Sequence, residues 1–209
     1  DNVQARCNYQ LFLYAEKEDE GQQRELEFLK KVETQEPQDW NRMAVVFLEL
    51  GYFEEAFRVL KKLELAFPYD EGTLHRLAVC RYHMGQYDLA QAYYDKLLKI
   101  DPQDTVAAYY RRICYKAVSG EKEEVDWLYH YEVPYVEVLN RVKSINDTTK
   151  QPREVMVDRW KNDEGFRALL GWSLHLPDVS AKRALLSLIA GFGDKKAEEA
   201  LRHFQLDQM

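Results

Sequence analysis

The sequence has few cysteines, no long apolar run and no excess of basic residues. Its 3 cysteines are widely spaced without a C-x-x-C pair, which argues against a disulfide framework and a structural zinc site. No stretch approaches the roughly 18 consecutive apolar residues of a membrane span, and the first residues do not resemble a signal peptide. The net charge of -7, with basic and acidic residues interleaved, offers no footprint for nucleic-acid phosphates. These absences predict a cytoplasmic protein with buried thiols and no membrane or nucleic-acid partner.

Signatures of catalysis are also missing. The chain has no G-x-S-x-G turn, no glycine-rich phosphate loop and no acid pair within a defined site. Its histidines are scattered over different predicted elements without metal-ligand spacing, and surface or groove positions explain them better. They are His75, His83, His130, His175 and His203. The sequence therefore predicts no enzyme activity, no metal and no cofactor.

A repeat of 34 residues is what the sequence does contain. Such a period is typical of stacked helical hairpins, each too small to bury its own apolar face. Five residues of one copy recur in the next at this spacing. The pairs are Gly51 and Gly85, Phe53 and Tyr87, Ala56 and Ala90, Leu63 and Leu97, and Pro68 and Pro102.

Each repeated residue type has a physical role. A glycine suits the tight turn between antiparallel helices, because it adopts a left-handed backbone without steric cost. An alanine where the second helix crosses the first lets the two backbones approach closely. A proline ends the second helix. The pattern therefore predicts helical hairpins at residues 37–70 and 71–104.

These hairpins resemble the tetratricopeptide repeat. The family pattern, W-x2-L-G-x2-Y followed by A-x3-F and P, is approximated at Trp40, Met43, Ala44, Phe47, Ala56, Leu60 and Pro68, and again at Leu74, Leu77, Ala78, Arg81, Ala90, Tyr94 and Pro102. Arg81 departs from the family's aromatic residue. The resemblance implies an all-α fold: an α-solenoid of antiparallel helical hairpins, a tetratricopeptide-like superhelix with a concave groove, followed by additional C-terminal helices.

Weaker hairpins flank the two good copies. Residues 3–17 and 22–35 predict a hairpin with a longer loop, and residues 105–118 and 121–131 predict another, broken at Ser119-Gly120. Together these copies supply the three or more hairpins that a stable stack needs. We expect the tetratricopeptide-like part to span residues 1–133.

Residues 134–209 predict a helical extension in which the repeat register is lost. The expected elements are a short helix at 135–145, a polar linker or loop at 146–152, and two short helices within 153–175 broken near 162–165. A final hairpin at 178–206, with Asp178 or Ser180 and then Asp194 as helix caps, resembles a HEAT repeat. The stack is expected to continue beyond Met209, because no polar capping helix ends it.

The resemblance also implies which residues line the groove. Positions 2, 5, 9 and 12 of the first helix of each repeat face the concave side. They map onto Asn41, Val45, Leu48, His75, Val79, Tyr82, Tyr109, Ile113 and Lys116. This apolar and aromatic strip suits an extended peptide or an amphipathic helix. The alternative, that the N-terminal hairpin or the C-terminal helices cover several of these residues, stays open.

The predicted function is a non-enzymatic scaffold that binds a protein or peptide in this groove. A carboxylate clamp for chaperone C-termini is disfavoured, because Val45, Val79 and Ile113 stand where the family places carboxylate ligands. Two alternatives remain: a regulatory or sensory domain of a larger protein that responds to a peptide or small ligand, and a homo-oligomerisation scaffold. The sequence identifies neither the partner nor the oligomeric state.

Overall fold

The computed structural model describes residues 2–206, which form twelve helices and no strand. The all-α class is confirmed. The helices are α1 Val3–Glu16, α2 Asp19–Lys31, α3 Pro37–Glu49, α4 Phe53–Ala66, α5 Glu71–His83, α6 Tyr87–Ile100, α7 Thr105–Val118, α8 Tyr135–Thr149, α9 Arg153–Asn162, α10 Glu164–Ser173, α11 Val179–Ala190 and α12 Lys195–Leu206. None of these combines the length and apolar character that a bilayer-crossing helix needs.

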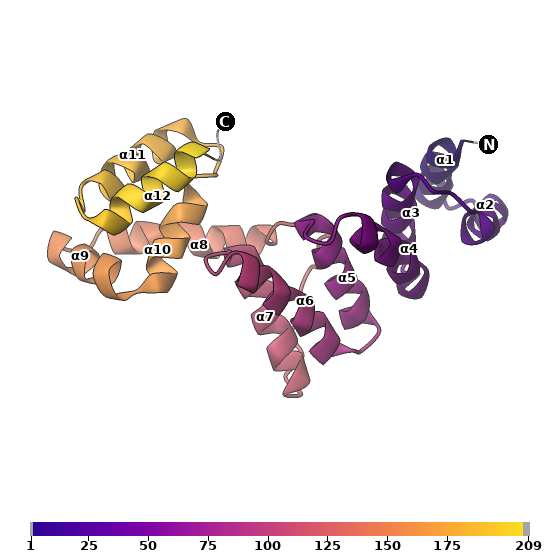
Figure 1. The fold of residues 1–209 in the computed structure, drawn as a ribbon, viewed down its shortest axis with the longest axis horizontal. Helices are drawn as coiled ribbons and strands as arrows, with labels where there is room; N and C mark the ends of the chain where they lie inside the picture. The colour runs from indigo at the N-terminus through magenta and orange to yellow at the C-terminus, as the bar shows by residue number, and fades with distance from the viewer. Residues whose placement is uncertain (1, 207–209) are drawn as a thin grey trace. The chain divides into compact units, whose positions relative to one another are not determined.

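The chain divides into two compact units, residues 1–132 and 133–209. In unit 1, α1 packs on α2 and α3, and from α3 to α7 each helix packs on the next (Figure 1). Neighbours in sequence are therefore neighbours in space, which is the arrangement of an α-solenoid.

The repeated residues occupy the turns and crossings that their chemistry predicts. Gly51 and Gly85 both have φ of +75°, in the left-handed region. Ala56 and Ala90 are fully buried where α4 and α6 cross their partner helices. Arg81, the departure from the family pattern, places its guanidinium 4.0 Å from the centre of the Phe57 ring, so a cation–π contact replaces the usual aromatic packing.

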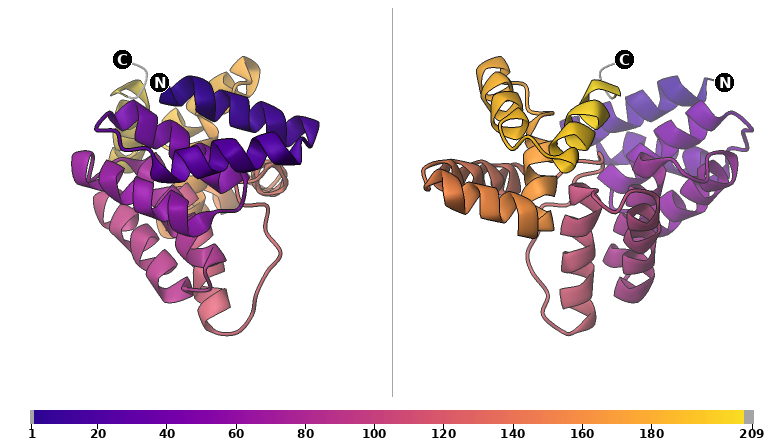
Figure 2. Two further views of the ribbon diagram at one scale, coloured as in Figure 1. Left: turned by 90° about the vertical axis from the view of Figure 1, so that its right-hand side faces the viewer. Right: turned by 60° about the vertical axis from the view of Figure 1, so that its left-hand side comes forward.

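Two details of the flanking hairpins differ from prediction. The prediction of a longer loop between α1 and α2 is wrong. The connection is short because Lys17 adopts φ of 58°, the left-handed conformation that Gly51 and Gly85 adopt in their turns. The Glu18 side chain then caps α2 by accepting from the Gly21 amide. The second helix expected at 121–131 is also wrong. This stretch has no helical turns and runs as an extended chain from α7 towards α8 (Figure 2).

Unit 2 has its own core around Trp160, whose ring stacks on Phe192 with centroids 4.6 Å apart. The expected break between two short helices is confirmed, with Asp163 joining α9 to α10. The helix caps at Asp178 and Asp194 are confirmed as well, each accepting from backbone amides at 2.8 Å.

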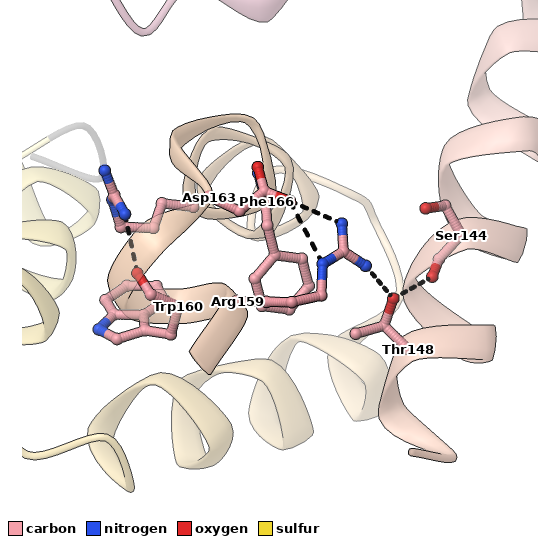
Figure 3. Close-up of polar contacts among 7 residues, drawn as sticks. Ser144, Thr148, Arg159, Trp160, Asp163 and Phe166 are labelled. Carbon is pink, nitrogen blue, oxygen red and sulfur yellow. Dashed lines mark hydrogen bonds and ion pairs between the residues drawn. The ribbon is translucent and has the colours of Figure 1, made fainter. Parts of the chain in front are cut away.

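The polar linker expected at 146–152 is wrong for its first half, since α8 continues to Thr149. The Thr148 hydroxyl donates to the Ser144 carbonyl at 2.8 Å and accepts from Arg159 on α9 at 2.8 Å (Figure 3). These bonds give the polar side chains of this turn partners, so the helix persists through a sequence that reads locally as a loop.

Candidate functional site

The extended segment Glu121–Glu132, which we call the strap, runs back along α5 and α7. Its side chains alternate in burial, as expected of an extended chain whose successive residues point to opposite faces. From Glu123 to Tyr131, the residues with odd numbers are partly buried and most of those between them are exposed. The partly buried ones are Glu123, Val125, Trp127, Tyr129 and Tyr131, and the exposed ones include Glu124, Asp126, His130 and Glu132.

Trp127 is the main aromatic contact of the strap with the helices. Its ring lies 4.4 Å from Tyr82 and 5.0 Å from Tyr110, measured between centroids, and it is nearly parallel to Tyr110 at 24°. It also meets His83 edge-on at 6.0 Å. Offset and tilted aromatic pairs at these separations add to the free energy of apolar burial. The indole thus joins the strap to two helices, α5 and α7.

His75 holds the strap's main chain through a defined tautomer. Its Nε2 lies 2.9 Å from the Leu128 carbonyl oxygen, which can only accept, so Nε2 carries the proton. Nδ1 then accepts from the Tyr94 hydroxyl, also at 2.9 Å. Burial lowers the pKa of His75 to about 4, with the nearby charges of Arg76 and His130 acting in the same direction. The imidazole is therefore neutral at physiological pH.

Two tyrosines fasten the strap's carboxyl end. The Tyr131 hydroxyl donates to the Asp104 carboxylate, which also caps α7 by accepting from two amides of its first turn at 2.9 Å. The Tyr110 hydroxyl donates to the Glu132 carbonyl at 2.9 Å. Burial raises the pKa of both Tyr110 and Tyr131, and the hydrogen bond to Asp104 raises the pKa of Tyr131 further. Both phenols therefore remain donors.

An ion pair fastens the strap's amino end. Lys116 on α7 donates to the Glu123 carboxylate, and this bond lowers the pKa of Glu123. Both side chains are partly exposed, so the pair contributes little net stability. The pair links the start of the strap to α7.

The nine predicted groove residues differ in how far they are exposed in the structure. The buried ones are Leu48, His75, Val79, Tyr82 and Ile113; the half-buried ones are Val45, Tyr109 and Lys116; and Asn41 is exposed. Contacts with the strap include those of His75, Tyr82 and Lys116. That these nine residues bind a partner stays a prediction.

The strap contacts both His75 and Tyr82. Sequence reasoning missed Tyr110, Trp127 and Tyr131 as members of this site. For Trp127 and Tyr131 the signal was the alternation of apolar and polar residues from Val125 to Tyr131, interrupted at Leu128, which has the period of an extended chain.

The three cysteines are buried and unpaired, as predicted. Burial raises the pKa of each thiol to about 12, the reverse of what a nucleophilic cysteine requires. Among residues 2–206, no group of three or more His, Cys, Asp or Glu side chains is placed to hold a metal ion.

A second candidate site is a cleft of about 540 Å³ in unit 2, between α8 and α9. It is lined by Asn140, Lys143, Ser144, Asp147, Thr148, Gln151, Val155 and Arg159. Arg159 donates to Thr148 at 2.8 Å and forms an ion pair with Asp163 at 2.9 Å (Figure 3). Its guanidinium therefore serves the fold, and the cleft is a weaker candidate than the groove.

The fold is that of a helical-repeat protein in which an extended segment, the strap, packs against α5 and α7. Residues 72–104, which span α5 and α6, match the family model of the tetratricopeptide repeat. The chain therefore contains a tetratricopeptide repeat, as its sequence pattern predicted. Neither a search of curated proteins nor a search of solved structures found a match. The likeness of α11 and α12 to a HEAT repeat stays a prediction.

Proposed function

We propose that this protein is a non-enzymatic interaction module that binds an extended segment of a partner protein in the groove formed by α3, α5 and α7. Tetratricopeptide repeats generally mediate protein–protein interaction, and the family is typically a non-enzymatic scaffold. The observation that carries the proposal is the strap itself. A groove that holds one extended chain has the donors and aromatic surfaces that another such chain requires.

The contacts of the strap support this choice of ligand class. Main-chain carbonyls are recognised by His75 and Tyr110, and these bonds do not depend on which side chain the ligand carries. Trp127 supplies the aromatic anchor against α5 and α7. Main-chain bonds with pockets for alternate side chains are how extended peptides are usually recognised.

Photo-crosslinking tests where a partner binds. A photoreactive amino acid replaces Asn41, a predicted groove residue that is exposed on α3, in the full chain. The matched control carries it in place of Lys99, which is exposed on α6. After irradiation in native lysate, we expect protein-sized adducts from position 41 and few from position 99. Equal adduct yields at both positions, or none from position 41, would contradict binding in the groove.

A further inference from the structure

We propose that the strap is a built-in competitor: it occupies the groove in place of the partner, and the partner is an extended segment with the strap's own pattern. The inference rests on the proposed function and specifies both the ligand and its regulation. The pattern is a carboxylate followed by side chains at alternate positions, as in Glu123, Val125, Trp127, Tyr129 and Tyr131.

The polar contacts of the strap come from side chains that a ligand could engage equally well. His75 and Tyr110 donate to its carbonyls, Asp104 accepts from Tyr131, and Lys116 pairs with Glu123. None of these donors and acceptors requires that the extended chain be covalently joined to α7. A separate peptide with the same spacing would meet each of them in turn.

Incomplete burial distinguishes the strap from the helices beneath it. Trp127, Tyr129 and Tyr131 are only partly buried, whereas His75, Tyr82 and Tyr110 under them are fully or almost fully buried. Regions with less burial open at lower free energy than the core. The strap can therefore leave while the helical stack stays folded.

Attachment at both ends makes the strap an effective competitor. It follows α7 through Gly120, whose φ of +86° turns the chain back, and it leads into α8 after Pro134. A tethered segment has an effective concentration on the order of millimolar. Because only the open fraction of the protein binds, the apparent dissociation constant of a partner is the intrinsic one divided by that fraction. Weakening the strap should therefore tighten binding in trans.

The test uses the full chain and a fluorescent synthetic peptide with the sequence of residues 121–132. In Tyr131→Phe the strap loses its hydroxyl bond to Asp104 but keeps its ring, whereas the peptide still carries this hydroxyl. Losing a hydrogen bond to a charged group corresponds to about a tenfold change in an equilibrium constant. Fluorescence anisotropy should therefore show about three- to tenfold tighter binding than to the wild type, and a larger gain for Trp127→Ala. Tyr69→Phe, the same substitution at an exposed residue outside the strap, should leave the affinity unchanged.

The outcomes separate the competing occupants. A peptide with alanine at the positions of Trp127 and Tyr131 should bind every protein weakly. The inference is overturned if Tyr131→Phe binds the peptide no better than the wild type does. This outcome decides the matter even if Trp127→Ala does not fold. If light scattering shows that the wild type is a dimer and the peptide does not bind, the inference is overturned. The groove would then accept the strap of a second copy of the chain.

Failure of the inference is distinguishable from failure of the proposed function. If the wild type and Tyr131→Phe bind the peptide equally and tightly, the groove accepts an extended segment and the strap does not compete. The proposed function is contradicted instead if the photo-adducts do not concentrate at position 41. That measurement uses a protein whose strap is unchanged.

Discussion

Lowering the pH should destabilise unit 1 through His75. In the folded protein the pKa of this imidazole is about 4, against an ordinary value of 6.5. Between these values the unfolded chain binds a proton that the folded chain does not, so stability is complete above pH 6.5 and falls as the pH is lowered towards 4. The linkage relation gives a loss of about 2 kcal/mol in the free energy of unfolding by pH 5, and about 3 kcal/mol in total.

The assay compares urea unfolding of the wild type with that of His75→Gln over a series of pH values. Glutamine retains a side-chain N–H that can donate to the Leu128 carbonyl, but it does not titrate. We expect the stability difference between the two proteins to shrink by about 2 kcal/mol from about pH 8 to pH 5, because only the wild type loses the contribution of His75. Unit 2 is identical in both proteins, so its own pH dependence cancels.

Parallel pH curves for the two proteins would refute this reasoning, since they would mean that His75 titrates alike in the folded and unfolded states. An NMR titration of the imidazole provides the direct check. Its resonances should stay constant until the pH approaches about 4.

Two further predictions test the turns and the core. Gly85→Ala should lower the free energy of unfolding by about 1 kcal/mol, because alanine disfavours the left-handed region. A Cβ at this position would meet nothing within 4 Å, so the whole cost comes from the backbone conformation. Gly171→Ala, in helix α10 with equally open surroundings, is the control, and urea unfolding should show no loss or a gain of up to about 1 kcal/mol. The three cysteines should not react with a thiol reagent in the native protein, since burial raises the pKa of each thiol to about 12. All three should react in urea. Rapid reaction of the folded protein would show that this burial is incomplete.

The hairpins were predictable because their signals are local. Gly51 and Gly85 mark turns through backbone conformation, and Ala56 and Ala90 mark crossings through side-chain size. Neither property depends on distant residues. The short turn at Lys17 was missed because a lysine at φ of 58° is an exception to the residue preferences of that region.

The strap was only partly readable. The 34-residue step places Glu124 where Ala90 stands in the preceding repeat, and a glutamate is too large and too polar for a buried helix crossing. This mismatch is a local signal against a second helix after α7, and the helix predicted at 121–131 is wrong because that signal was not weighed. Of the predicted groove residues, His75, Tyr82 and Lys116 do lie beneath the strap, whereas Tyr110 was missed because it is adjacent to the predicted Tyr109 on the same helix.

The sequence by itself determined the helical class, the tetratricopeptide repeat at residues 72–104 and several of the turns, because periodicity, turn glycines and capping residues act over a few neighbouring positions. Only the tertiary structure decided what the strap packs against. The contacts from Leu128 to His75 and from Tyr131 to Asp104 join residues far apart along the chain. The alternating pattern of an extended segment predicts its local conformation but does not specify the surface on which it packs. That surface forms only when the helices have stacked.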